Sequence, residues 1–264
     1  MQQVIDISWW QIALFATTLL IPYAINNYYK LEIGKDATVG LIRMAIQLAL
    51  VGLYLEYLFY LDSFAVNLVW LLVMIIVGAN AIAAKSKLPK RPVVSFLVFA
   101  LCIGLFPILA LLCLVTVQPD PFYSAQYAIP LSGMLLGNSL GGNIVALQNF
   151  YSALENRWSE YQASIALGAP ISIATLPFVR VSLQKSLAPI LATMATTGLV
   201  SLPGMMTGQI LGGASPVVAV KYQLVIMMAI WVMMSISIVV CLNLVVYRGF
   251  DASGKPKIRP QTSG

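Results

Sequence analysis

The stretch FAVNLVWLLVMIIVGANAIAA at residues 64–84 decides the fold class, because it is almost entirely apolar and carries no charged side chain. A helix of roughly 20 residues crosses the ~30 Å hydrocarbon layer of a bilayer. Similar runs recur along the chain, which is 60% hydrophobic and 9% charged. One soluble core could not bury so much apolar surface in 264 residues. The sequence therefore predicts an all-α membrane protein, a polytopic helical bundle.

Apolar runs bounded by charged or turn residues predict about seven transmembrane helices. The first has no basic residue before it and no small-residue cleavage site after it, so it does not resemble a removable signal peptide. Before the last, Ser215 and Pro216 resemble an N-cap followed by proline at the first helical position. The predicted spans lie near residues 8–29, 39–60, 64–84, 93–117, 127–150, 187–211 and 217–247.

The basic residues indicate the orientation, since cytoplasmic loops of membrane proteins are enriched in Lys and Arg. With the N-terminus outside and the C-terminus cytoplasmic, thirteen of the fifteen basic residues lie on the inner side, Lys221 lies outside and Arg43 lies within a span. Inner loops facing anionic lipid then explain the net charge of +6, and no nucleic-acid partner is expected. The inner residues are Lys30, Lys35, Lys85, Lys87, Lys90, Arg91, Arg157, Arg180, Lys185, Arg248, Lys255, Lys257 and Arg259.

Residues 1–250 are predicted to form one transmembrane domain, followed by a short basic cytoplasmic tail at 251–264. The longest inner loop, at about 151–186, contains aromatic and aliphatic residues at helical spacing among charged ones. Pro170 and Pro177 are expected to break this pattern. Such an amphipathic helix lies on a membrane surface or docks onto a soluble partner, and the pattern alone leaves both open.

Polar residues in the fifth span are candidates for a translocation pathway. Gly133, Gly137 and Gly141 stack on one helical face, which favours close packing of another helix. Amides in a membrane must find partners or water. Both packing and pathway lining therefore remain open for this span. Its amides are Asn138, Asn143, Gln148 and Asn149.

The sixth span is interrupted by Ser201-Leu202-Pro203-Gly204. Proline removes a backbone hydrogen bond and glycine weakens the next turn, so we expect a kinked or broken helix. Broken membrane helices commonly line transport sites, although a kink that only shapes packing is the alternative. We expect Pro203→Ala to restore a continuous helix and to impair transport. The predicted pathway residues here are Ser201, Pro203, Gly204, Met205, Met206 and Gln209.

Arg43 and Glu56 are ionisable residues within the second span, where charge is costly and is often functional. Both lie near enough to the span ends to snorkel, so a structural role is equally compatible. Glu56 is assigned to the pathway, and Glu56, Met205 and Met206 are the candidate metal ligands. Because the chain has no histidine and thioethers suit copper(I), the methionines fit a flexible pathway lining better than an iron site.

Two motifs are absent from the sequence. Neither a G-x-x-x-x-G-K-[ST] phosphate-binding loop nor a G-x-S-x-G nucleophile motif occurs. We therefore expect no enzymatic activity and no cofactor bound by this chain. If ATP drives transport, a separate subunit must bind ATP and Mg²⁺.

Residues 201–216, SLPGMMTGQILGGASP, followed by VKYQ at 220–223, closely resemble the signature of the FetB family of bacterial ABC-transporter permeases, whose members are associated with iron export. The likeness extends to KSKLPKR at 85–91 and IPLSGMLLGNSLGG at 129–142. It implies a permease homodimer in the bacterial inner membrane, with two copies of a cytoplasmic ABC ATPase. Plant relatives are linked to UDP-glucose, so a sugar nucleotide or another small solute is the alternative substrate. A secondary carrier or channel without an ATPase is the alternative class.

The same resemblance places an ATPase-coupling segment in the inner loop. ABC permeases often carry E-A-A-x-x-x-G there, and QASIALGAP at 162–170 is similar, with Gly168 at the six-residue offset. Gln162 stands at the glutamate position, and the nearest acid is Glu160. The residues that the resemblance assigns to ATPase coupling are Glu160, Gln162, Ala163, Gly168 and Ala169.

Overall fold

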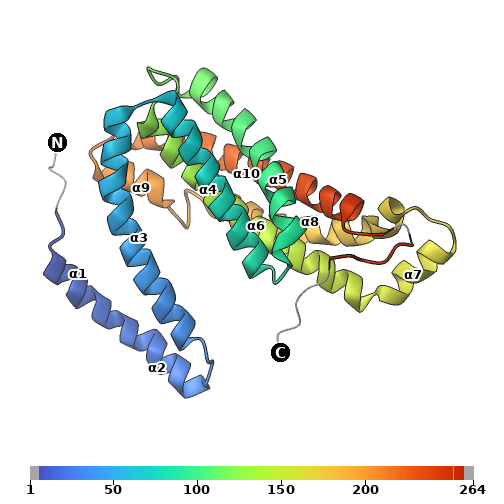
Figure 1. Cartoon of the computed structure of the whole chain (residues 1–264). Coiled ribbons are helices and arrows are strands. Elements are labelled where there is room, and N and C mark those ends of the chain that lie inside the picture. Colours follow the sequence, from blue (N-terminus) through green and yellow to red (C-terminus); the bar gives the residue numbers. More distant parts are fainter. Residues whose placement is uncertain (1–5, 252, 259–264) are drawn as a thin grey trace.

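The computed structural model describes residues 6–251 and 253–258, without the side chain of Lys90, and this part of the chain is helical (Figure 1). Residues 252 and 259–264 of the predicted basic tail, Arg259 among them, lie outside the described residues. The helices are α1 (Trp9–Ala16), a 3-10 turn (Thr17–Leu19), α2 (Leu20–Tyr29), α3 (Gly34–Leu61), α4 (Phe64–Lys85), α5 (Lys90–Leu111), a π-helical turn (Leu112–Thr116), α6 (Ala125–Asn156), α7 (Trp158–Ala166), α8 (Ile171–Thr196), α9 (Gly204–Leu211) and α10 (Pro216–Arg248).

The described helices agree with a helical membrane protein. Four segments are long and apolar enough to cross a bilayer: Gly34–Leu61, Phe64–Lys85, Arg91–Thr116 and Pro216–Arg248. Helices α6 and α8 also have sufficient length but are more polar, since α6 carries several amides and α8 carries Arg180 and Lys185. The count of seven spans and the orientation of the termini stay predictions.

The helix at the predicted sixth span begins earlier than residue 187. Helix α8 begins at Ile171, directly after its N-cap Pro170, so residues 171–186 of the predicted inner loop are helical. Pro177 lies inside α8 and does not end it. A proline removes one backbone donor, and burial of neighbouring side chains such as Phe178 offsets that loss. In contrast, the prediction that Ser215 caps α10 before Pro216 is confirmed.

Helix α10 packs against α5, α6, α8 and α9 and is the central helix of the bundle. Helix α10 lies close to α6 at Gly142, where an added Cβ would lie 2.6 Å from Met234 Sδ. Gly142 directly follows Gly141, the last of the three glycines that the sequence predicted to stack on one face of this helix. An added Cβ at Gly133 would lie 3.6 Å from a side-chain atom of Met74, whereas none at Gly137 or Gly141 would meet a described atom within 4 Å.

Helices α1 to α3 form an arm that leans away from the bundle (Figure 1). The arm is joined at the far end of α3, where Leu58 clusters with Ala125 and Ile129 of α6. The rings of Tyr54 and Trp70 lie 4.2 Å apart at the same junction. Most of α3 is therefore exposed, and its polar residues lie outside the core.

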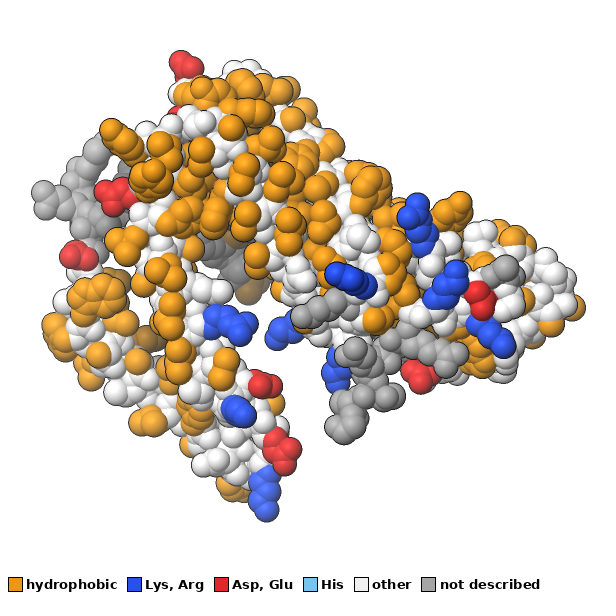
Figure 2. Space-filling view, viewed as in Figure 1, with side chains coloured by type: hydrophobic (Ala, Val, Ile, Leu, Met, Phe, Trp, Pro, Cys, Tyr) orange, Lys and Arg blue, Asp and Glu red, His pale blue; other side chains and the backbone are white. Residues whose placement is uncertain are grey.

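Basic side chains are distributed unevenly over the visible face of the molecule. Figure 2 shows Lys and Arg toward the α2–α3 turn, α7 and the end of α10, while hydrophobic side chains dominate the opposite part. This is the one-sided distribution that the predicted topology requires. We call the end that contains α7 the α7 end.

Candidate translocation pathway

A break separates α8 from α9, as the sequence predicted. Helix α8 ends at Thr196, residues 197–203 are not helical, and Pro203 is the N-cap of α9. Gly198 adopts φ +90° and its N–H donates to the Ser201 carbonyl over 2.9 Å. Because seven residues and a left-handed glycine make this break, we no longer expect Pro203→Ala alone to restore a continuous helix.

A cavity of about 310 Å³ lies beside the break, between the end of α8 and the beginning of α10. We call it the methionine cavity, since Met side chains from α8, α9 and α10 line it. The other lining side chains are mainly aliphatic, and no Asp, Glu, Lys or Arg is among them. Its lining includes Met194, Leu202, Met206, Gln223, Met227 and Met228.

Gln223 and Thr197 provide the polar side chains in the lining of this cavity. The Gln223 side chain is 5% exposed, and no described group hydrogen-bonds to its Oε1 atom. On α9, the Oε1 atom of Gln209 is likewise buried without a described donor. Buried acceptors in proteins are normally paired, and both of these oxygens are enclosed by neighbouring atoms and not open to the cavity.

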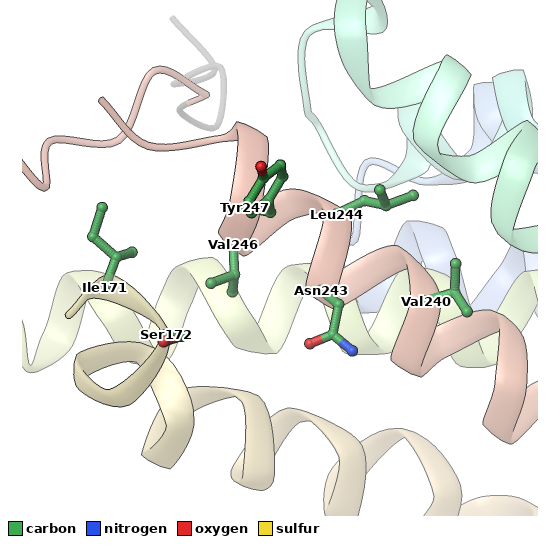
Figure 3. Close-up of a pocket in the computed structure, with 7 residues that line it drawn as sticks. All are labelled: Ile171, Ser172, Val240, Asn243, Leu244, Val246 and Tyr247. Atoms are coloured by element: carbon green, nitrogen blue, oxygen red, sulfur yellow. The ribbon is translucent and has the colours of Figure 1, made fainter. Parts of the chain in front are cut away.

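A second cavity, of about 690 Å³, lies at the α7 end between the first residues of α8 and the last turns of α10 (Figure 3). Figure 3 shows Asn243 and Val246 pointing from α10 toward α8, whereas Tyr247 lies on the other side of α10. We call it the inner cavity. Helices α8 and α10 thus run antiparallel, with one cavity at each end of their contact.

Between the two cavities, residues of both helices are fully buried in the bundle: Ser182 of α8, and Met233, Ser237 and Ile238 of α10. Met233 and Ser237 lie beside Gly104 of α5, and Ile238 lies beside Gly142 of α6. The middle of α10 is therefore enclosed by its neighbours, whereas a cavity borders each of its ends.

The amides of α6 have different partners. Asn138 is exposed and donates to a carbonyl of its own helix. Gln148 donates to the Lys85 carbonyl over 2.9 Å, which joins α6 to the end of α4. Asn143 is buried and donates to Ser237 Oγ over 3.0 Å, which joins α6 to the middle of α10. Asn143 therefore has a packing role that Asn138 lacks.

Helix α7, the predicted coupling helix, has one face on the bundle and one face exposed. Tyr161 is 2% exposed, and its ring lies 5.8 Å from that of Phe250 and 6.5 Å from that of Phe178. Its hydroxyl donates to the Gly254 carbonyl over 2.7 Å. Helix α7 is thereby attached to α8 and to the segment that follows α10. Helices α8 and α10 both line the two cavities.

The exposed face of α7 and the turn after it carry the residues assigned to ATPase coupling, of which Ala169 is half-buried. Gln162, Ala163 and Gly168 are exposed, and Leu167 beside them is 88% exposed. Gly168 adopts φ +87° at the turn that ends the helix.

Arg157 and Glu160 form an ion pair at the start of α7. The Arg157 guanidinium also lies 5.4 Å from the Phe178 ring centroid, a cation–π distance. Hydrogen bonds from Arg157 lower the pKa of Glu160 below its ordinary value. Glu160 is therefore held toward α7 itself, beside the exposed face.

The structure brings together some of the predicted pathway residues and separates others. Met206 lines the methionine cavity, and Met205 packs against the main core. Glu56 is exposed on α3 and does not line the cavity. The candidate metal ligands Glu56 and Met206 therefore do not share a site there. Among the described residues, no group of three or more His, Cys, Asp or Glu side chains could hold a metal ion.

Sequence reasoning had missed Gln223. It lies inside the apolar stretch 217–247, where a single amide attracts little notice. A glutamine within a predicted span is itself the signal that could have found it, because an amide in hydrocarbon requires a partner.

Comparisons with known proteins place the chain among membrane proteins. A family model described as "Uncharacterised protein family (UPF0014)" matches residues 9–250. The chain is 32% identical to the UPF0014 membrane protein YjkA of Bacillus subtilis, over 79% of this chain and 82% of that protein. It is 29% identical to the probable iron export permease protein FetB of Escherichia coli, over 90% of each chain. It is 30% identical to the protein ALUMINUM SENSITIVE 3 of Arabidopsis thaliana, over 79% of this chain and 75% of that protein. No solved structure matches at a significant level.

Proposed function

The chain belongs to the UPF0014 family, and from this membership we propose that it is the membrane-spanning permease subunit of an ATP-driven exporter. The observation that carries the proposal is the similarity, along 90% of the chain, to a protein named as a probable iron export permease. Iron or an iron-bearing species is accordingly the proposed cargo. A sugar nucleotide or another small solute is the second candidate.

The α8–α10 contact supports a transport route. A mid-membrane break in a helix is tolerated where protein or a water-filled cavity satisfies the freed backbone groups. The break before α9 borders the methionine cavity, and the inner cavity lies at the other end of the same contact. Opening and closing of the packed layer between them would give alternating access to the two sides.

A separate ATPase supplies the energy in this proposal. An ATPase can drive the change only if it binds the two conformations with different free energies. The exposed face of α7 is the surface that it would contact, and Tyr161 links this helix to α8 and α10. Two permease copies and two ATPase copies, in the inner membrane of a bacterium, complete the proposed assembly.

A secondary carrier without an ATPase is the competing class. Such carriers are built from repeats with paired broken helices, and their sites depend on ion coordination. The sequence has one clear break within a predicted span, at residues 201–204, whereas a carrier of this kind would have a pair.

Reconstitution tests the proposal directly. The permease is co-expressed with the ABC ATPase encoded nearest to it, purified as a complex and placed in vesicles loaded with a fluorescent iron chelator. We expect ATP-dependent iron movement that disappears when the phosphate-binding lysine of the ATPase is replaced by alanine. If the permease retains no ATPase during purification and transport proceeds without ATP, the exporter proposal is wrong.

A further inference from the structure

Two basic residues of α8 lie near the middle of its contact with α10. Ser172 lines the cavity at one end of this contact, and Met194 lines the cavity at the other end. Residue 183 is halfway between them, so Arg180 precedes the midpoint by three residues and Lys185 follows it by two. At the rise of an α-helix, both lie within about 5 Å of the midpoint. Since α10 is long and apolar enough to cross a bilayer, the two cations lie at mid-crossing depth and not in the inner loop that the sequence predicted.

Neither cation has a partner in the part of the chain that the structure describes. Both side chains are exposed, and no described residue forms an ion pair or a hydrogen bond with either. Arg180 is nine residues from the start of α8 and Lys185 is eleven residues from its end, about 13 Å and 16 Å of helix. Snorkelling serves residues near helix ends, and an unpaired charge deep in lipid is costly. Water or a polar molecule must therefore surround these two side chains.

The exposed side of α8 has the reverse of the pattern that lipid requires. We call it the outer face of α8, because the other side of this helix is buried against α6 and α10. A lipid-facing helix is apolar in the middle and carries its polar residues at the ends. On the outer face Arg180, Gln184 and Lys185 are exposed in the middle. The exposed large apolar side chains flank them: Ile173, Leu176 and Leu191.

A second copy of this chain has no acid to neutralise these cations. The chain has nine Asp and Glu residues, and each lies outside the helices, in the short helix α7 or within two turns of a helix end. Glu56, for example, is five residues from the end of α3. Copies inserted in the same orientation have their acids at the same depths. A negative charge at the middle of the outer face therefore has to come from a solute.

The side chains on this face suit anionic oxygen atoms. Guanidinium and ammonium groups form charge-assisted hydrogen bonds with carboxylate and phosphate groups, and the Gln184 amide supplies a further donor. A bare Fe²⁺ ion would instead be repelled by both cations. Arg180, Gln184 and Lys185 line neither of the two cavities, so they form a separate site on the same helix.

We propose that the outer face of α8 is a water-exposed binding site for the carboxylate or phosphate groups of an anionic organic cargo, held by Arg180, Gln184 and Lys185. The proposal rests on the transport function above and specifies the charge of the cargo. Iron then passes this site as a negatively charged chelate and not as a bare ion. The phosphates of a sugar nucleotide are the other source of the same chemistry.

The surroundings of the outer face can be tested with a single cysteine. Gln184→Cys is introduced into full-length permease that lacks its three native cysteines, and the protein is placed in phosphatidylcholine nanodiscs without ATPase. Two water-soluble methanethiosulfonates are compared, the anionic sulfonatoethyl and the cationic trimethylammonioethyl reagent, with rates taken relative to those with mercaptoethanol. We expect both to react and the anionic reagent to react faster. Ile76→Cys, at an exposed apolar position in the middle of α4, should react with neither because lipid covers it.

Binding by the protein with its native cysteines, in the same nanodiscs, identifies the anionic group. Equilibrium dialysis compares UDP-glucose, which carries phosphates, with ferric citrate in excess citrate, which carries carboxylates, and with uncharged glucose. We expect at least one anionic probe to bind and glucose not to bind. The probe that binds distinguishes the two sources of the chemistry. A variant with both Arg180→Gln and Lys185→Gln should bind that probe about ten-fold more weakly or less, because both charged donors are lost.

A matched variant removes the same two kinds of charge elsewhere. Arg43→Gln with Lys221→Gln changes exposed residues of α3 and α10 and should keep the affinity. Lys185→Gln alone serves if the double variant of α8 does not insert, and it should weaken binding several-fold.

Three results would overturn the proposal. The first is a reaction at Gln184→Cys no faster than at Ile76→Cys, which would show that lipid or protein covers the outer face. The second is that neither anionic probe binds. The third is equal affinity of the unchanged protein and the double variant of α8. Because no ATPase is present, these results are independent of the ATP-dependent transport that tests the exporter function.

Discussion

The hydroxyl of Tyr161 donates a 2.7 Å hydrogen bond to the carbonyl oxygen of Gly254, across 93 residues of sequence. This bond attaches α7 to the segment that follows α10. An added Cβ at Gly254 would lie 3.2 Å from the same hydroxyl, so the two segments are in close contact. A displacement of α7 would therefore be passed to α10 and to the cavities along it.

Tyr161→Phe should reduce the coupling between ATP hydrolysis and transport. The ring contacts with Phe178 and Phe250 are kept, and a hydrogen bond worth about 1 kcal/mol is lost. We expect normal expression and assembly, with more ATP hydrolysed per molecule transported. Simultaneous ATPase and transport assays measure this ratio. Tyr60→Phe is the matched control, because Tyr60 of α3 is 87% exposed and lines neither cavity, and an equal effect of both substitutions would contradict the role of Tyr161.

Gly168→Arg should weaken binding of the ATPase. Gly168 adopts φ +87°, where a side chain adds strain of about 1–2 kcal/mol, and a bulky cation would obstruct a docked subunit. Asn tolerates this backbone conformation, so Gly168→Asn should retain most of the binding. Pull-down of the ATPase by each variant is the measurement. Unchanged binding by Gly168→Arg would leave α7 as a helix on the membrane surface.

Local sequence rules predicted the features that one or two residues determine. The break near Pro203 and the start of α10 at Pro216 are of this kind, because a proline fixes its own φ angle and lacks a backbone donor. Pro177 was misjudged, since packing around α8 outweighed its missing donor. The contact of Tyr161 with Gly254 joins segments that only tertiary structure brings together, and no local pattern could have predicted it.

Gly142→Val should destabilise the protein by about 1–3 kcal/mol through overpacking. An added Cβ would lie 2.6 Å from Met234 Sδ and 3.1 Å from Ile238 Cδ1, so α6 and α10 would have to separate. Gly141→Val changes the neighbouring glycine, whose added Cβ meets no described atom within 4 Å. Thermal unfolding of the detergent-solubilised permease, followed by fluorescence-detected size exclusion, compares them. The packing described here is wrong if the Gly141 variant is the less stable of the two.

The Arg157–Glu160 pair should persist at mildly acidic pH. Hydrogen bonds from Arg157 lower the pKa of Glu160, so the contribution of the pair is complete above the ordinary glutamate pKa of about 4.3 and is lost as the pH falls through the lowered value. The ion pair is therefore formed at both about pH 7 and about pH 5, and it should cause no difference in ATPase binding between these two pH values. Both groups are exposed, so Glu160→Gln should have only a small effect. Pull-down at both pH values, for the unchanged and Glu160→Gln proteins, checks this. A loss between these pH values that Glu160→Gln prevents would contradict the lowered pKa.

The topology can be tested with single cysteines at opposite ends of the bundle. The native Cys102, Cys113 and Cys241 are first replaced by alanine. Lys85 and Lys221 are exposed at the end of α4 and the beginning of α10, so a cysteine at either position should be accessible without disturbing the core. With the predicted orientation, an impermeant maleimide should label Lys85→Cys only from the cytoplasmic side, in inverted vesicles, and Lys221→Cys only in intact spheroplasts.

The same measurement at the two ends of the chain shows whether the number of transmembrane spans is odd or even. Asp6→Cys and Lys255→Cys change exposed positions before α1 and after α10. Seven crossings place them on opposite sides, because each crossing reverses the side of the chain. Labelling of Asp6→Cys from outside and of Lys255→Cys from inside would agree with seven spans. Labelling of both from the same side requires an even number. Since α3, α4, α5 and α10 meet the length and hydropathy needed to cross, the error would then lie in α1 and α2 or in α6 to α9.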